Sequence, residues 1–427
     1  MTGIEAAREQ DLRGEKGYHI YLRNSRNQIE QPYKDGAEDK EAVPGHDIVT
    51  TIDASLQQYG QQLMKNKVGS LVAIEPSTGE ILALVSSPGI DVEQLADIGR
   101  HYEEISKNPY KPMYNRAVSA SYPPGSVFKL VNGLIGLEEG VLRPEMMYPC
   151  SQGYHFGAGR KLGCHIHKSP LNMEESIMMS CNAYYCYVLK NILDNRKYDN
   201  VAEGMDAWHE YVESFGFGRK LGSDFPAELA GGIPTSRTYN RAYGKGHWNS
   251  TTVISLSIGQ GEILATPLHL ANFCATLANR GYYYIPHIIK ASEGVEIDPK
   301  YYEKQYTKVS TAQFPKVIHG MWRAVNGGQG SGCTAHVAAV EGLDICGKTG
   351  TAQNPRGADN SVFICFAPRE NPKIAVAGYV ENGGFGASYA APMASLMVER
   401  YLTGTVSRKD LEKRMKDANL LSRVKKD

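Results

Sequence analysis

The sequence lacks several features that would assign its 427 residues to a common functional class. It has no run of about eighteen apolar residues, so no membrane-spanning helix is predicted. Residues 1–20 are polar and lack the apolar segment of a signal peptide. Lys plus Arg and Asp plus Glu both number 46, so nothing indicates a nucleic-acid partner. The eight cysteines include no C-x-x-C pair, so that redox and metal-binding motif is absent.

The chain does contain strand-like apolar runs near both ends, with a mostly helical middle between them. The clearest hairpin surrounds residues 76–79, whose Pro, Ser, Thr and Gly favour a turn. The predicted strands are residues 47–52, the hairpin 70–86, 343–353, 361–368 and 373–381. The remaining predictions are a helix at 54–65, a Gly-rich loop at 151–163 and a closing helix at 391–402. This order predicts an α/β fold of the α+β kind, with one antiparallel sheet covered by helices on both faces.

The two ends of the chain differ from this pattern. Residues 1–43 are polar and lead to Pro44-Gly45, which predicts a linker. Residues 405–427 are rich in charge, which predicts a solvated helical tail. The folded domain is therefore expected to span residues 44–404.

The stretch SYPPGSVFKL, residues 121–130, contains the first candidate catalytic pair. Two prolines and a glycine restrict the backbone before Ser126, and helical apolar spacing begins directly after it. Lys129 follows at i+3, on the same helix face as the serine. A serine that only caps a helix, followed by a surface lysine, would explain this pair without chemistry. Further motifs must decide between the two interpretations.

Two such motifs follow in order: Ser180-Cys181-Asn182, then Lys348-Thr349-Gly350-Thr351. Serine becomes a good nucleophile when a neighbouring base takes its proton, and a buried lysine beside a second cation can be that base. We therefore expect Ser126 to be the nucleophile, Lys129 the base and Lys348 an ammonium. Ser180 would relay a proton to the leaving amine, and Asn182 would orient Lys129 and a substrate amide.

The remaining residues of the third motif complete the predicted site. Thr349 and Thr351 offer hydroxyls to a substrate carboxylate, and Gly350 would let the substrate backbone lie against the strand. The backbone N–H groups of Ser126 and Thr351 could form an oxyanion hole.

With S-x-x-K, S-x-N and K-T-G in this order, the chain resembles the class B penicillin-binding proteins, which are peptidoglycan D,D-transpeptidases. Further similar segments include VAIEPSTGEILALVSSPGID and SIGQGEILATPLHLANFCATLANRG. GGIPT, HWN and SIGQGE are most similar to the elongation type, penicillin-binding protein 2. The resemblance covers residues 44–404, and residues 1–43 resemble the end of the non-catalytic pedestal. It implies the penicillin-binding protein and β-lactamase-like transpeptidase fold.

The resemblance also implies a substrate and partners. A donor stem peptide ending in D-Ala-D-Ala would acylate Ser126 and release D-Ala, and an acceptor amine would then take the acyl group. β-Lactams would bind and inhibit, and no cofactor is implied. The family pairs with a membrane glycosyltransferase of the elongation machinery, at the periplasmic face of the inner membrane, and acts in cell shape. The family's membrane anchor is not found in this chain, so we expect a fragment.

Two alternatives use the same serine. A β-lactam hydrolase or D,D-carboxypeptidase would need a base that activates water, and Glu228 is the tempting candidate. The resemblance instead places Glu228 in a connection between helical regions. A β-lactam sensor would be acylated and stay acylated without catalysis.

A cysteine and histidine segment leaves a second question open. Cys150, Cys164, His165 and His167 lie close in sequence, near a place where some relatives carry metal-binding residues. Zinc binding, a disulfide and free buried thiols all remain possible, so no metal is assigned. Cys181, inside the second motif, is expected to be a small packing residue.

Overall fold

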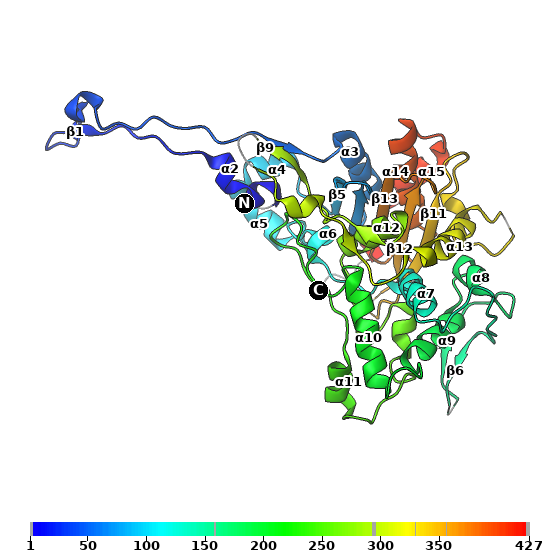
Figure 1. Cartoon of the computed structure of the whole chain (residues 1–427). Coiled ribbons are helices and arrows are strands. Elements are labelled where there is room, and N and C mark those ends of the chain that lie inside the picture. Colours follow the sequence, from blue (N-terminus) through cyan, green and yellow to red (C-terminus); the bar gives the residue numbers. More distant parts are fainter. Residues whose placement is uncertain (1–2, 158, 293–295, 329, 356, 424–427) are drawn as a thin grey trace.

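The computed structural model describes residues 3–423 except 158, 293–295, 329 and 356. Its centre is a five-stranded antiparallel sheet in the order β11-β12-β13-β4-β5 (Figure 1). These strands are β4 (Gly69–Ile74), β5 (Ile81–Ser87), β11 (Cys346–Ala352), β12 (Asn360–Ala367) and β13 (Ile374–Val380). The early hairpin and the three late strands meet where β13 pairs with β4, with Ala377 opposite Val72. The predicted antiparallel sheet is therefore present, and β11 is an edge strand.

Both faces of the sheet are buried, which explains why its strands read as continuous apolar runs. Side chains alternate along each strand, so Val72 and Leu71 enter different hydrophobic clusters. One face packs against α3 (Ala54–Met64) and α14 (Ala390–Thr403), as predicted for residues 54–65 and 391–402. The other face packs against α12 (Pro267–Ala278), which is buried along its whole length.

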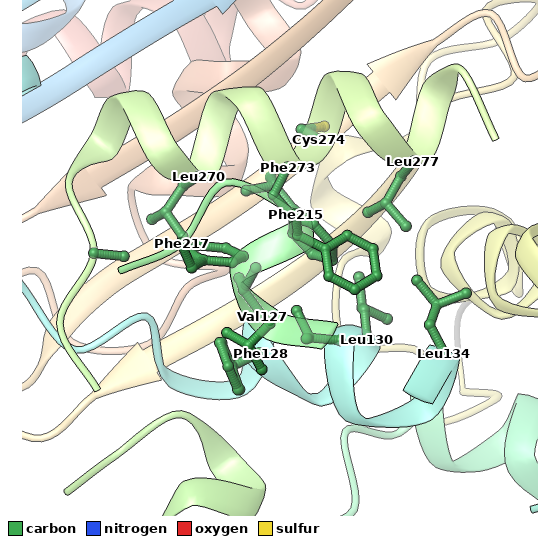
Figure 2. Close-up of a cluster of buried hydrophobic side chains, with 14 of the residues drawn as sticks. Val127, Phe128, Leu130, Leu134, Phe215, Phe217, Leu270, Phe273, Cys274 and Leu277 are labelled. Carbon is green, nitrogen blue, oxygen red and sulfur yellow. The ribbon is translucent and has the colours of Figure 1, made fainter. Parts of the chain in front are cut away.

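The helices beside α12 form a second layer of the hydrophobic core. Figure 2 shows Phe215 and Phe217 between α12 and the segment that contains Val127 and Phe128. The rings of Phe128 and Phe217 meet edge to face, with centroids 5.6 Å apart. The helices of this region are α6 (Arg116–Ser119), α7 (Lys129–Glu138), α8 (Met173–Met178), α9 (Asn182–Leu193), α10 (Val201–Ser214), α11 (Ser236–Tyr243) and α13 (Phe314–Asn326). The start of α7 is thus held in place by a buried aromatic cluster.

The predicted linker at residues 1–43 contains regular structure. After α1 (Gly3–Ala7) and α2 (Glu9–Arg13), the chain forms the exposed hairpin β1 (Tyr21–Arg23) and β2 (Ile29–Pro32), which extends away from the body in Figure 1. Backbone bridges continue this arm toward its base, as between Glu15 and Val43. The predicted strand at 47–52 is β3 (Ile48–Thr50), which pairs with β9 (Ile289–Ser292). Residues 1–2 lie outside the described part.

Two sequence predictions were wrong in detail. The loop at 151–163 contains a small hairpin of β6 (Gly153–His155) and β7 (Lys161–Gly163). The tail forms the predicted helix, α15 (Lys409–Asp417), but it is not fully solvated, because Met415 and Leu420 are each 1% exposed. Burying these apolar side chains docks the tail on the domain. The last four residues of that tail prediction, 424–427, lie outside the described residues.

The remaining elements are short. They are α4 (Val92–Ala96), α5 (Ile98–Lys107), β8 (Tyr282–Tyr283), β10 (Gln305–Tyr306) and the 3₁₀ turns, of which η2 (Gly125–Phe128) and η3 (Ile254–Ile258) border the site. Across the described residues, every helix is too short or too polar to cross a membrane.

Candidate active site

The turn that carries Ser126 is clamped between two backbone segments. Gly125 has a φ of +58°, and its N–H donates to the Gly259 carbonyl at 3.0 Å. A Cβ on Gly125 would lie 2.6 Å from the Thr351 carbonyl oxygen on β11. Only glycine therefore fits, for both conformational and steric reasons. The 3₁₀ turn η2 then leads directly into α7, which begins at Lys129. The predicted position of Ser126 at a helix start is what the structure has.

A partly buried network that the sequence motifs did not predict supports the same turn. Tyr122 exchanges two backbone hydrogen bonds with Ala265, and its hydroxyl donates to Glu381 Oε1 at 2.6 Å. Its ring stacks on Tyr379, with centroids 4.2 Å apart. Arg116 Nε also donates to Glu381 Oε1, at 3.3 Å. These contacts join the residues before Ser126 to the end of β13. Only the tertiary contact with Glu381 indicates a role for Tyr122.

Ser180 lies between the two predicted lysines. Lys348 Nζ donates to Ser180 Oγ at 2.8 Å, and Lys129 Nζ lies 3.3 Å from the same oxygen. Lys129 Nζ also donates to the Ser180 carbonyl and to Asn182 Oδ1, each at 2.6 Å. Ser180 has a φ of +56°, a strained conformation that concentrates at functional sites. The three motifs therefore meet at one buried hydrogen-bonded centre.

Burial changes the protonation of both amines, which are 0% exposed. Loss of hydration lowers the pKa of Lys129 to about 8. Burial, followed by the nearby charge of Lys129, holds the pKa of Lys348 well below its ordinary value. This lowering of the Lys348 pKa favours the neutral amine, opposite to the predicted ammonium. A bound carboxylate would favour its charged form again.

A cavity of about 610 Å³ opens onto this centre. Its lining includes Ser126, Ser180, Asn182, Thr349 and Thr351, all predicted from the sequence. Within the described residues, Ser126 Oγ makes no hydrogen bond. Catalytic hydrogen bonds often form only when substrate is bound, so this geometry leaves Ser126 available.

Gly350 packs against the turn that carries Ser126. It does not line the cavity, and a Cβ there would lie 3.0 Å from Val362 Cβ and 3.1 Å from the Pro124 carbonyl oxygen. The glycine thus lets the Ser126 turn pack against β11, and its contact with a substrate backbone stays a prediction. The sequence motifs also missed lining residues that come from other segments. These are His165, Ile258, Gln260, Thr334, Gln353, Asp359 and residues 385–388.

The hairpin β6–β7 brings a set of metal-ligand side chains behind Asn182. One donor atom from each of Cys150, Cys164, His167 and Cys181 lies within 4.8 Å of the others. Cys164 Sγ lies 3.4 Å from His167 Nε2 and accepts a hydrogen bond from the Asn182 N–H at 3.2 Å. All four fit a tetrahedral zinc site. Cys181, expected to be only a packing residue, belongs to this set, and His165 does not.

The cysteine thiols and Asn182 are linked through this cluster. Contact with Cys181 holds the pKa of Cys164 well below its ordinary value, which favours the thiolate that binds metals. The Asn182 Nδ2 donates to the Gly163 carbonyl at 2.6 Å, one residue before Cys164. The hairpin therefore orients the side chain that accepts from Lys129.

Glu228, the candidate base for a hydrolase, lies away from the cavity. It is 3% exposed, and its carboxylate accepts from the Leu221 N–H at 2.5 Å and from the Ser223 N–H at 3.0 Å. These bonds give the carboxylate a structural role between two backbone segments.

Comparison with known proteins decides the family. Residues 69–399 match the family model described as the penicillin binding protein transpeptidase domain. The chain belongs to this family. It is 31% identical to the peptidoglycan D,D-transpeptidase MrdA of Acinetobacter baumannii, over 94% of this chain and 60% of that protein. The predicted penicillin-binding protein 2 type is confirmed.

Solved structures of penicillin-binding proteins agree with this assignment. The crystal structure of Pseudomonas aeruginosa PBP2 in complex with WCK 5153 is 30% identical, with a TM-score of 0.76 over 96% of this chain and 84% of that chain. One chain in the structure of a peptidoglycan synthase complex that coordinates polymerization and crosslinking is 27% identical to this chain. Its TM-score is 0.73 over 95% of this chain and 70% of that chain. The predicted transpeptidase fold is confirmed. This chain spans about three fifths of the length of the first curated relatives that it matches.

Proposed function

We propose that residues 44–404 form the catalytic domain of a peptidoglycan D,D-transpeptidase of the elongation type. The observation that carries this proposal is Ser180 Oγ between the amines of Lys129 and Lys348, beside Ser126 in one cavity. A serine and two buried lysines can activate a nucleophile without a histidine. The match to the transpeptidase family and the MrdA relatives support the same activity.

In the acylation step, Ser126 Oγ attacks the carbonyl carbon of the penultimate D-Ala of a donor stem peptide. The hydroxyl proton passes to neutral Lys129, and the N–H groups of Ser126 and Thr351 stabilise the oxyanion. The C–N bond to the terminal D-Ala then breaks. Ser180 Oγ passes its proton to the leaving amine and takes the proton held by Lys129 in return, so D-Ala departs, Lys129 is neutral again and an ester on Ser126 remains.

The terminal carboxylate of the donor lies beyond the reacting carbonyl, at the C-terminal end of the stem peptide. Thr349 and Thr351 offer hydroxyls there, and Lys348 offers a cation once the carboxylate favours its charged form. In the second step an acceptor amine attacks the ester, a new amide forms, and Ser126 regains its proton. The product is a cross-link between two stem peptides.

The test is covalent trapping by benzylpenicillin, because a β-lactam imitates D-Ala-D-Ala. Intact-mass measurement should show one added penicillin per chain, lost in Ser126→Ala, with the adduct persisting for minutes or longer. Turnover of many penicillins would indicate the hydrolase or carboxypeptidase alternative. A stable adduct on a protein that never transfers a peptide would indicate the sensor. A folded protein with neither adduct nor turnover would refute the proposal.

The relatives support a proposal for the cellular role. We place the domain at the periplasmic face of the inner membrane, where it would act in cell elongation with a membrane glycosyltransferase. The likeness to a peptidoglycan synthase complex supports this partner. Copurification of the protein with such a polymerase would test it.

We also propose that Cys150, Cys164, His167 and Cys181 hold a zinc ion. Four converging donors including a histidine favour zinc over a disulfide, which would use two thiols. Zinc would stabilise the hairpin as a closed structural site. These residues would then hold Asn182 in the orientation in which its Oδ1 accepts a hydrogen bond from Lys129.

A further inference from the structure

The far end of the active-site cavity has a distinct chemical character. Besides the catalytic residues, its described lining contains two ionisable side chains, His165 and Asp359. Asp359 lies in the connection from β11 to β12, past Thr351 and Gln353, and Phe385 forms the neighbouring wall. This end therefore combines one carboxylate with one aromatic ring.

Hydrogen bonds hold the segments that carry these two residues next to each other. The Asp359 carbonyl accepts from the Gly384 N–H at 2.7 Å, and Ser361 Oγ donates to the Phe385 carbonyl at 2.8 Å. These bonds tie the segment after β13 to the start of β12. Asp359 and Phe385 therefore lie on one preformed wall, although 26 residues of sequence separate them.

Both side chains have unused binding capacity. Among the described residues, the hydrogen bond to the Asp359 carboxylate comes from the Asn354 N–H at 3.3 Å, and no Lys, Arg or His there pairs with it. Phe385 is 74% exposed, although it lines a concave site. An exposed aromatic ring and a carboxylate that no cation of the described residues pairs with, on adjoining segments of one cavity, match a ligand that carries methylene groups and ends in a cation.

The direction of the substrate places its side chain here. β11 is an edge strand, so an extended peptide can add to it as an antiparallel strand. With the terminal carboxylate at Thr349 and Lys348, the preceding stem residues run past Thr351 toward Gln353. The residue before D-Ala-D-Ala then lies nearest to Asp359 and Phe385.

We propose that Asp359 and Phe385 form a specificity subsite for an amine-bearing side chain of the donor stem peptide, an inference that rests on the proposed transpeptidase function. The ammonium pairs with the Asp359 carboxylate, and the methylene groups pack on Phe385. The subsite thus selects donors in which the residue before D-Ala-D-Ala is a diamino acid with a free amine.

The test uses two penicillins that differ by one charge. The first carries a 6-aminohexanoyl side chain, and the second is its N-acetyl derivative. At pH 7.5 the free amine is an ammonium, since an ordinary alkyl amine has a pKa of about 10.4. The parent protein should be acylated about three- to tenfold faster by the first, the range of a partly exposed charge pair. Asp359→Asn should abolish that preference, while the exposed Asp410→Asn makes the same charge change outside the cavity and should keep it.

Each outcome has a separate meaning. An unchanged preference in Asp359→Asn, or none in the parent, overturns the subsite, whereas absence of any adduct with both penicillins overturns the proposed function. Phe385→Ala should slow both probes by a similar factor, because both have the same methylene chain; unchanged rates overturn the role of the ring. If Asp359→Asn slows only transfer of a peptide acyl group to an added amine, the carboxylate serves the acceptor and the donor assignment is wrong.

Discussion

The sharpest test of the catalytic centre is the protonation of Lys129. Burial lowers its pKa from 10.5 to about 8, so the charged form is destabilised by about 3 kcal/mol. At pH 7.5 this raises the neutral fraction from about 0.1% to about 25%, a gain of about 200-fold. Because only the neutral amine can accept the Ser126 proton, the acylation rate should depend on this fraction.

The assay is the second-order rate of acylation by benzylpenicillin as a function of pH, followed by intact mass. We expect a rise of about tenfold per pH unit between 6 and 7.5 and a plateau above pH 8, where Lys129 is mostly neutral. Lys129→Arg keeps a cation that donates hydrogen bonds but cannot lose its proton. It should lower the rate by about 10²–10⁴-fold at every pH.

Three results would refute this reasoning. A rate that keeps rising to pH 10 would mean that burial does not lower the relevant pKa. A rate independent of pH from 6 to 9, or Lys129→Arg acylating at the parent rate, would mean that Lys129 is not the base. Lys348→Ala should chiefly weaken recognition of the penicillin carboxylate and keep the pH profile. Loss of the profile in that variant would assign the titration to Lys348 instead.

Gly125→Ala should abolish acylation in a folded protein, because its Cβ would strike the β11 backbone, whereas Gly89→Ala, which has no close contact, should acylate normally. Metal analysis should find one zinc per chain, lost in Cys164→Ser; absence of metal, with a two-dalton mass gain on reduction, would establish a disulfide instead. Met415→Ala should lower the free energy of unfolding by about 2–5 kcal/mol in chemical denaturation. The exposed Lys413→Ala should change it by less than about 0.5 kcal/mol.

Most of the fold could be predicted because it depends on patterns among residues that are close in sequence. The β4–β5 hairpin follows from apolar runs around a turn, and α3 and α14 follow from helical spacing. The docking of the tail helix was missed because charge dominates its composition, whereas apolar side chains such as Met415 and Leu420 are buried against the domain. The composition of the tail alone does not show whether the rest of the chain has a surface on which the tail can dock.

The types of the catalytic residues could also be predicted from the sequence, but their arrangement in space could not. Ser126 and Lys129 are adjacent because four residues of one helix start hold them. Gly350 belongs to a sequence motif, but only the tertiary structure shows that a side chain at this position would meet Pro124. Tyr122, Glu381, Asp359 and Phe385 have no motif, since their partners lie far away in sequence.

By itself, the sequence determined the sheet strands, the order of the three motifs and the glycine-dependent turn, because each depends on neighbouring residues and on backbone conformation. Tertiary structure decided that Ser180 lies between two lysines from segments 51 and 168 residues away. It also decided that three cysteines and a histidine converge behind Asn182, and that both amines lose their hydration. Distances across the fold and burial of charge depend on how the whole core packs, which no local pattern of residues contains.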